Sequence, residues 1–309
     1  MDRLDKYRGI IPAFYACYDD SGAVSTARTR ALARSFVNKG VRGLYVCGSS
    51  GECIYLSVEE RKRILESVME ETRGTGVTVI AHVACNNTAD SVELAAHAES
   101  LGVDAIAAIP PIYFHLPDHA MAKYWNDISA GAPNTDFVIY NIPQLAGVAL
   151  TLPLLREMRK NPRVIGVKNS SMPIQDIQMF RDEAGEECII FNGPDEQLAG
   201  GLMVGAEGGI GGTYGVMPEV YMAIYDAVMR GNRKKAMELQ NKANRIIYAL
   251  CGCPRGSMLA AIKEVIRLRE GITLGGVRAP MASLEPEDME QIHLCVKLID
   301  ELVAEGGLG

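Results

Sequence analysis

Arg163-Val-Ile-Gly-Val-Lys-Asn-Ser-Ser171 is the stretch of sequence that decides the fold. It reads as a short strand that is apolar on both sides, which is typical of a parallel strand with both faces covered. Strict alternation of side chains places Val164, Gly166 and Lys168 on one face of the strand. The same rule places Ile165 on the opposite face.

The lysine at the carboxyl end of this strand requires an explanation. A buried ammonium group is costly because it loses its hydration. The cost is smaller if the amine is neutral, and a neutral amine is a nucleophile. The ordinary alternative is that Lys168 marks the exposed end of the strand. The strand alone leaves both interpretations open.

Short apolar runs alternate with amphipathic helical stretches along the whole chain, at a spacing of roughly thirty residues. We expect strands over 9–16, 43–47, 77–83, 104–109, 136–141, 164–168, 188–192 and 207–211. We expect helices over 25–38, 88–101, 118–129, 152–160, 174–184, 219–229, 233–250 and 258–269, one more from Ser57, where Glu60 completes a capping box, and a last one after Glu287.

Eight strand–helix units in series predict an α/β fold, a (β/α)8 TIM barrel with additional C-terminal helices. We expect a single domain over 1–309, with the barrel in 1–230 and a helical extension in 231–309. A doubly wound open sheet is the alternative fold. It requires a glycine fingerprint after the first strand, and residues 17–22 do not match one.

The composition describes an acidic globular chain. Its 309 residues are 48% hydrophobic and 22% charged, with a formal net charge of -7. That balance is ordinary for a soluble globular protein. The acidic sign disfavours nucleic acid or an anionic membrane as a partner. A small anionic substrate stays open, because local cations can override the overall sign.

The termini and the cysteines indicate the compartment. Five of the first eight residues are charged, and no apolar stretch that suits a signal peptide follows them. No apolar run is long enough to span a bilayer. The 8 cysteines are scattered and form no CxxC pair, which favours reduced thiols. We therefore expect a cytoplasmic protein.

Residues whose side chains could bind a substrate or take part in catalysis lie at the carboxyl ends of the predicted strands, where the active site of such a barrel lies. The turn Gly48-Ser-Ser-Gly-Glu52 follows strand two and suits an anion such as a carboxylate. Tyr140 ends strand five and is placed to relay protons, and Lys168 ends strand six. Asp195 and Glu196 follow strand seven and can accept hydrogen bonds from a polyol. The ordinary alternatives are a tight turn, a core tyrosine and a pair of helix caps.

No metal site stands out among the five histidines. His115 and His119 are four residues apart, but the intervening Pro117 breaks the helix that would align them. The glycine-rich residues 205–215 lack the lysine and the spacing of a P-loop. Phosphate bound near strands seven and eight is a second interpretation of that region.

These motifs resemble those of the dihydrodipicolinate synthase and N-acetylneuraminate lyase family of class I aldolases. The resemblance runs from Gly9 to about Pro280. It is carried by three motifs, Gly48-Ser-Ser-Gly-Glu52, Tyr140-Asn-Ile-Pro143 and Gly166-Val-Lys168.

The resemblance implies a Schiff-base mechanism. Lys168 attacks the ketone of a 2-oxo acid, and the protonated imine is the electron sink, so no cofactor other than this covalent imine is needed. Tyr140 shuttles the proton, and Ser49 and Ser50 hold the carboxylate. Tyr113 falls where the family places a tyrosine near the subunit interface and the active site. The family is usually a tetramer, so we expect a homotetramer built as a dimer of dimers.

The residues around the motifs indicate the branch of the family. Synthases that use aspartate semialdehyde typically carry an arginine where this chain has Gln144-Leu-Ala-Gly147. The lyases carry a Gly-x-Asp-Glu set for sugar hydroxyls, which Gly193, Asp195 and Glu196 match. They also carry Gly-Ser-Thr-Tyr where this chain has Gly211-Gly-Thr-Tyr214. Gly212 lacks that hydroxyl, a loss worth on the order of 1 kcal/mol.

The resemblance therefore implies a lyase that cleaves a 2-oxo sugar acid, N-acetylneuraminate, to pyruvate and N-acetylmannosamine. Two alternatives stay open. One is a pyruvate-dependent aldolase with another aldehyde, of which 4-hydroxy-tetrahydrodipicolinate synthase is an example. The other is a non-catalytic relative that binds pyruvate. The expected partner in each case is a small 2-oxo acid.

Overall fold

The computed structural model describes residues 3–308, and within them eight parallel strands form one sheet. Each strand is short and fully buried, as a strand covered by helices must be. The strands are β1 (Gly9–Pro12), β2 (Gly43–Val46), β3 (Thr78–His82), β4 (Ala105–Ala108), β5 (Asp136–Asn141), β6 (Val164–Asn169), β7 (Ile189–Asn192) and β8 (Gly208–Gly211).

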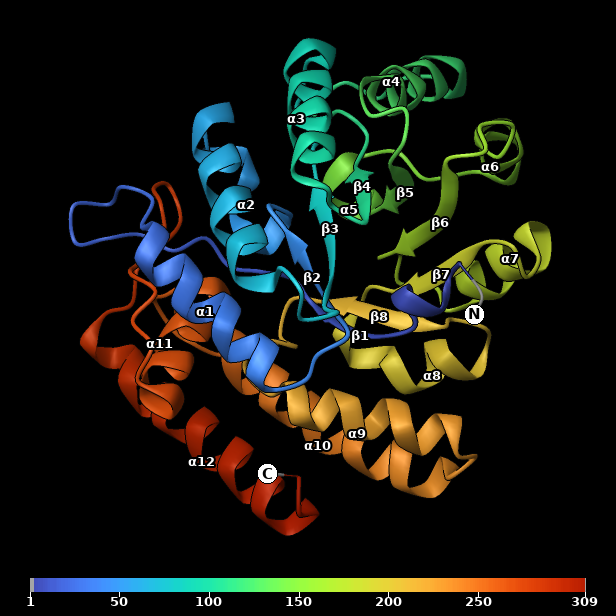
Figure 1. The fold of residues 1–309 in the computed structure, drawn as a ribbon. Helices are drawn as coiled ribbons and strands as arrows, with labels where there is room; N and C mark the ends of the chain where they lie inside the picture. Colours follow the sequence, from blue (N-terminus) through green and yellow to red (C-terminus); the bar gives the residue numbers. More distant parts are fainter. Residues whose placement is uncertain (1–2, 309) are drawn as a thin grey trace.

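The sheet closes on itself. Neighbouring strands follow the order β1-β8-β7-β6-β5-β4-β3-β2. The two end strands meet through the Arg42 amide, which donates to the Ile10 carbonyl at 2.9 Å, and the Phe14 amide, which donates to the Tyr45 carbonyl at 2.9 Å. The (β/α)8 barrel expected from the sequence is confirmed, and Figure 1 shows its strands ringed by helices.

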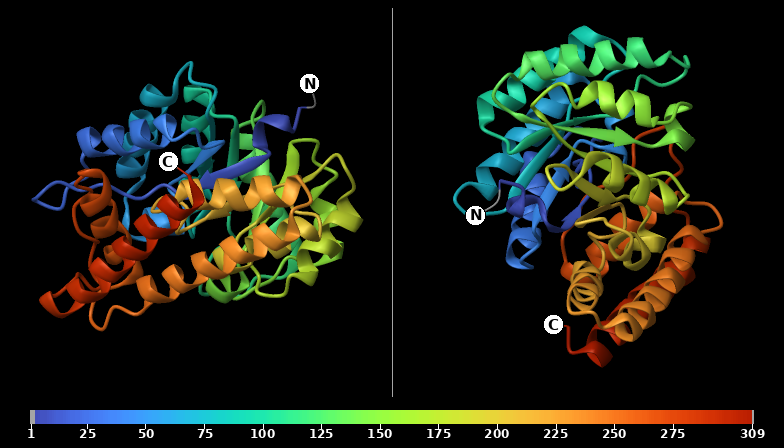
Figure 2. Two further views of the ribbon diagram at one scale, coloured as in Figure 1. Left: turned by 90° about the horizontal axis from the view of Figure 1, so that it is seen from below. Right: turned by 90° about the vertical axis from the view of Figure 1, so that its right-hand side faces the viewer.

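Helices follow the strands around the barrel. They are α1 (Thr26–Asn38), α2 (Val58–Thr72), α3 (Thr88–Leu101), α4 (Asp118–Gly131), α5 (Pro143–Ala146), α6 (Leu152–Met158), α7 (Gln175–Ala184), α8 (Leu198–Met203) and α9 (Pro218–Met229), then α10 (Arg233–Cys251), α11 (Met258–Glu270) and α12 (Met289–Gly306). Figures 1 and 2 show α10 to α12 gathered along one side of the barrel. No helix within residues 3–308 combines the length and apolar character that crossing a membrane requires.

Helix starts agree with the signals in the sequence. The Ser25 side chain accepts from the Arg28 amide at 3.3 Å and caps α1. Ser57 and Glu60 make both hydrogen bonds of the predicted capping box at the start of α2. The short helices α5 and α8 were not predicted, because four and six residues are too few for a helical period to be visible.

The prediction of strict alternation along β6 is wrong at its start. Ile165 packs inside the barrel with Tyr140, whereas Val164 packs outside against the helices. The register explains the difference, because Phe137 pairs with Val164 while the next residue of β5, Val138, pairs with Gly166. Ile165 is thus an extra residue in a β-bulge, which shifts the pattern without moving Lys168 from the inner face.

The first strand is also shorter than predicted. It ends at Pro12, and beyond it Ala13 makes an isolated bridge to Tyr45 of β2 and the Phe14 amide donates to the Tyr45 carbonyl. The apolar run continues to Ala16 because the last residues of the run are buried at the carboxyl end of the barrel without belonging to the strand. An apolar run in the sequence indicates which residues are buried. In this protein, burial continues beyond the residues that pair in the β-sheet.

Candidate active site

A cavity of about 250 Å³ opens at the carboxyl ends of the strands. Segments that follow β2, β5, β6, β7 and β8 all contribute to it, so residues far apart in the sequence meet here. It brings together eight of the predicted site residues, namely Ser49, Ser50, Tyr140, Lys168, Gly193, Asp195, Glu196 and Gly212.

Lys168 lies in this cavity with only 4% of the residue exposed. This burial excludes the alternative that Lys168 marks the exposed end of a strand. It pairs with Tyr140 across the β5–β6 ladder, so both side chains point into the barrel. The Lys168 Nζ lies 3.8 Å from the centre of the Tyr140 ring and 4.4 Å from that of Tyr45. Two phenol rings therefore enclose the amine.

Tyr45 and His82 are part of this arrangement, although the sequence reasoning did not select them. The Tyr45 ring meets that of Tyr140 edge-on at 5.8 Å, and His82 lies 6.1 Å from both. His82 is the last residue of β3 and Tyr45 the last but one of β2, and both side chains point inward, so the alternation rule applied to these strands would have found them.

His82 is held as a neutral imidazole. Burial, and next the positive charge of Arg61, lower its pKa well below the usual value. Its Nδ1 lies 2.9 Å from the Cys47 carbonyl, which can only accept, so the proton is on Nδ1. His82 thereby holds the peptide just before the Gly48–Glu52 turn.

The turn after β2 is a short 3-10 helix, η2 (Ser49–Gly51). Its two serines are half-buried and line the cavity. Gly48 is required here, because a Cβ at that position would lie 2.6 Å from the Tyr45 ring. The close packing of Gly48 on Tyr45 sets the depth at which the serines enter the cavity.

Asp195 also lines the cavity and does not act as a helix cap. Its Oδ2 accepts from the Thr213 amide and from the Thr213 hydroxyl, both at 2.6 Å. The Thr213 hydroxyl already donates its one hydrogen to Asp195. The Tyr221 hydroxyl, 2.6 Å away, is therefore the donor in its hydrogen bond to Thr213. Burial raises the pKa of Asp195 to about 6. The carboxylate is fixed by neutral donors rather than by a cation.

Three glycines shape this side of the cavity. A Cβ at Gly193 would lie 2.0 Å from the Ser170 Oγ, and one at Gly211 would lie 2.1 Å from an oxygen of Asp195. Gly211 does not itself line the cavity but lies against Asp195. Gly212 differs, because a Cβ there would meet only the Ser50 Oγ at 3.1 Å and Asp195 Oδ2 at 3.9 Å.

The sequence of this chain matches a known protein family over nearly the full length of the chain. The sequence model of the Dihydrodipicolinate synthetase family matches residues 6–299. The chain belongs to this family.

Relatives within the Dihydrodipicolinate synthetase family are similar over their whole length. The N-acetylneuraminate lyase of Mediterraneibacter gnavus is 61% identical over 299 residues, which cover 97% of this chain and 94% of that one. A solved structure of a catalytic lysine mutant of Ruminococcus gnavus sialic acid aldolase has 60% identity and a TM-score of 0.97, covering 99% of both chains. The Clostridium difficile protein CdNal, solved with mannosamine, has 29% identity and a TM-score of 0.89, covering 94% of this chain and 98% of that one.

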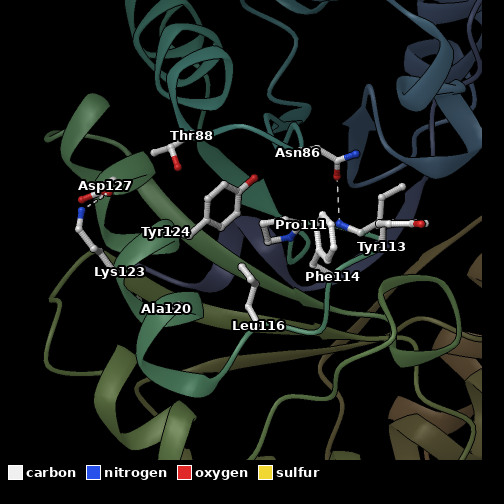
Figure 3. A pocket seen from close by; sticks show the side chains of 11 residues that line it. Asn86, Thr88, Pro111, Tyr113, Phe114, Leu116, Ala120, Lys123, Tyr124 and Asp127 are labelled. Atoms are coloured by element: carbon white, nitrogen blue, oxygen red, sulfur yellow. Dashed lines mark hydrogen bonds and ion pairs between the residues drawn. The ribbon is translucent and has the colours of Figure 1, made fainter.

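Tyr113, which the resemblance to this family marks as a site residue, does not reach the cavity within one chain. It is 85% exposed and has a φ of 88°, an unusual backbone conformation for a tyrosine. Figure 3 shows it with Phe114 beside a second cavity of about 600 Å³, where the Ile112 amide donates to the Asn86 side chain at 3.0 Å. The catalytic role of Tyr113 stays a prediction.

The C-terminal helices also reach the candidate active site of this family member. Ile247 in α10 and Met258 at the start of α11 line the cavity beside Asp195 and Glu196. No signal in the sequence indicated this, because their position depends on how the last helices fold back on the barrel. Within residues 3–308 no group of three or more potential ligands lies close enough to hold a metal ion.

Proposed function

We propose that this chain is a Schiff-base lyase that cleaves N-acetylneuraminate to pyruvate and N-acetylmannosamine. The observation that carries the proposal is the buried amine of Lys168, enclosed by the rings of Tyr45 and Tyr140 in a cavity that Ser49, Ser50 and Asp195 also line. High identity to N-acetylneuraminate lyase along nearly the whole chain supports it.

The proposed chemistry begins with the open-chain sugar acid. The lone pair of the Lys168 amine attacks the C2 ketone, and the C2 oxygen then leaves as water with a proton from Tyr140, which gives a protonated imine and leaves Tyr140 as a phenolate. Tyr140 accepts the proton of the C4 hydroxyl, the C3–C4 bond breaks, and its electron pair moves toward the imine nitrogen. N-acetylmannosamine leaves as an aldehyde. The resulting enamine takes a proton at C3 from Tyr140, and water then releases pyruvate and restores the amine.

Each end of the substrate has a matching side of the cavity. The hydroxyls of Ser49 and Ser50 hold the carboxylate next to the reacting ketone. Asp195 and Glu196 accept hydrogen bonds from the sugar hydroxyls. Asp195 Oδ1 is buried against Gly211 and has no hydrogen-bond partner within residues 3–308.

The lining of the cavity disfavours an aldehyde that carries its own carboxylate. Lys168 is the one basic side chain among the described residues that line it. The helix α5 stands where the synthases typically carry an arginine, and its Gln144 side chain donates to the Ser170 carbonyl instead. A second carboxylate would thus be buried without a positive partner.

The proposal extends to the conditions in which the protein works. The imine of Lys168 is itself the electron sink, so the reaction needs no added cofactor. We propose a homotetramer built as a dimer of dimers, supported by the exposed neighbouring rings of Tyr113 and Phe114, which are 85% and 71% exposed. We propose a cytoplasmic location, where both the sugar acid and reduced thiols are found.

Trapping of the intermediate tests the proposal. The protein is mixed with N-acetylneuraminate and borohydride, digested and analysed by mass spectrometry. A reduced pyruvate adduct on the peptide that contains Lys168 is expected, and Lys263, the other buried lysine, serves as the internal control. An adduct on another lysine, or none, would refute the assignment.

A further inference from the structure

A buried ion pair joins the Gly48–Glu52 turn to the C-terminal helices. The Lys263 Nζ in α11 donates to Glu52 Oε1 at 2.6 Å, and the two side chains are 2% and 0% exposed. Glu52 directly follows the serines of the turn, whereas Lys263 lies 211 residues further along the chain. Burial of both charges is costly, so it calls for further partners and for a reason.

Further hydrogen bonds do surround the pair. Glu52 Oε2 accepts from the Arg278 amide at 2.8 Å, and Lys263 Nζ also donates to the Gly276 carbonyl at 2.7 Å. The Lys263 Nζ lies 4.6 Å from the centre of the Tyr18 ring. The pair therefore ties the turn to α11 and to the segment that follows α11.

The backbone of the turn is in an unusual conformation at both ends. Cys47 has a φ of 58° and Glu52 a φ of 56°, although neither is glycine. Such conformations persist only where the surroundings hold them. At the first end, His82 binds the Cys47 carbonyl. At the second end, the ion pair with Lys263 holds the Glu52 side chain.

The hydrogen bonds within the turn connect Glu52 to the serines. The Glu52 amide donates to the Ser49 carbonyl at 3.0 Å, and the Cys53 amide donates to the Gly48 carbonyl at 3.3 Å. The turn is thus a small rigid unit that moves with Glu52. A change in the position of the Glu52 carboxylate alters the direction in which Ser49 and Ser50 face the cavity.

We propose that Glu52 and Lys263 are positioning residues for the carboxylate end of the substrate. Neither residue lines the cavity in the described part of the chain, so they act through Ser49 and Ser50. The inference rests on the proposed function, because it assigns the serines to the carboxylate. It also gives the C-terminal extension a task in the reaction, which is to fix the anion-binding turn.

The test compares ketone binding in wild-type protein and two variants. Glu52→Gln keeps the shape of the side chain and loses its charge. The double variant Glu52→Gln/Lys263→Met also removes the buried cation, so no uncompensated charge is left to prevent folding. Borohydride trapping of the imine on Lys168 is measured against pyruvate concentration and, separately, against acetone, which has no carboxylate.

We expect the half-saturating pyruvate concentration to rise about tenfold in both variants, with the maximal trapping rate within about twofold of wild type. The half-saturating acetone concentration should stay unchanged. Arg269→Met is the matched control, because Arg269 also lies in α11 and pairs with Glu219 at 3.0 Å and Asp300 at 2.9 Å, away from the turn. It should lower the unfolding temperature without changing pyruvate binding.

Three results would overturn the inference. One is pyruvate binding within twofold of wild type in the folded double variant. Another is an equal rise for acetone and pyruvate, which would indicate a general loss of structure. The third is a comparable rise in Arg269→Met. Wild-type protein that is not trapped by pyruvate at all would refute the proposed function itself, and the inference with it.

Discussion

At the scale of single residues, the main feature of the candidate active site is the Lys168 amine, which lies between the rings of Tyr45 and Tyr140. Lys168 and Tyr140 were candidates because each lies at the end of an apolar strand, and the resemblance to the family gave them their predicted roles. Tyr45 and His82 were missed, because a tyrosine and a histidine inside apolar strands are as typical of a core as of a site. The roles of all four remain predictions until variants are measured.

Asp195 gives the stability of the protein a pH dependence. Its pKa in the folded protein, about 6, lies above 3.8, the usual value for an aspartate, so the folded state binds its proton more tightly than the unfolded state does. The stability from this group is present below pH 4 and is lost as the pH rises through 6. Asp195→Asn cannot ionise and should lack this loss, which is on the order of 3 kcal/mol.

Urea unfolding of wild type and Asp195→Asn at steps from pH 4 to pH 7.5 measures the effect. As the pH rises across this range, the unfolding free energy of the wild type should fall relative to that of Asp195→Asn. A difference that is independent of pH would contradict the assigned pKa.

Gly212 and Gly211 provide a matched pair for the sugar side of the site. A Cβ at Gly212 requires only a small shift of the Ser50 hydroxyl, and Gly212→Ser restores the hydroxyl found in the lyases, so the KM for N-acetylneuraminate should fall by about fivefold, the equivalent of 1 kcal/mol. Gly211→Ser would press on Asp195 and should raise the KM instead. Steady-state kinetics compare them, and a rise in KM for Gly212→Ser would show that a hydroxyl there does not meet the sugar.

At the scale of elements, local signals were reliable and long-range ones were not visible. The capping box of α2 was predicted because Ser57 and Glu60 are three residues apart. The bulge at Ile165 was not, because it depends on how β5 and β6 pair and not on either strand alone. The contributions of Ile247 and Met258 to the cavity depend in the same way on the packing of whole helices.

The capping box makes a prediction about α2. Ser57→Ala removes the side chain that accepts from the Glu60 amide, and should lower the free energy of unfolding by about 1 kcal/mol. Ser100→Ala, at an exposed serine near the end of α3, is the control and should stay within about 0.5 kcal/mol of wild type. Equal effects of the two changes in urea unfolding would mean that the cap contributes nothing specific.

At the scale of the whole molecule, the last helices belong with the barrel. We propose that the barrel in 1–230 and the extension in 231–309 form a single domain, because the Glu52–Lys263 pair is buried between them. The family and the barrel could be predicted from the order of strands and three motifs. The side on which the extension packs could not, because no short motif encodes it.

The proposed assembly is open to a direct check. Light scattering on purified protein should give four times the mass of the chain at micromolar concentration. Tyr113→Asp and Phe114→Asp, which place a charge among exposed rings, should lower that mass, whereas Met237→Asp on α10 should not. A monomeric wild-type protein with full activity would refute both the tetramer and a catalytic role for Tyr113.

The central claim is that Lys168 cleaves N-acetylneuraminate through a covalent imine. Its most direct test is pyruvate release from N-acetylneuraminate, followed with a coupled dehydrogenase, in wild type and in Lys168→Ala. The account predicts turnover in the wild type and none in the variant. Circular dichroism should show that both proteins are folded. Turnover in Lys168→Ala would contradict the claim, and so would a wild-type protein that releases no pyruvate.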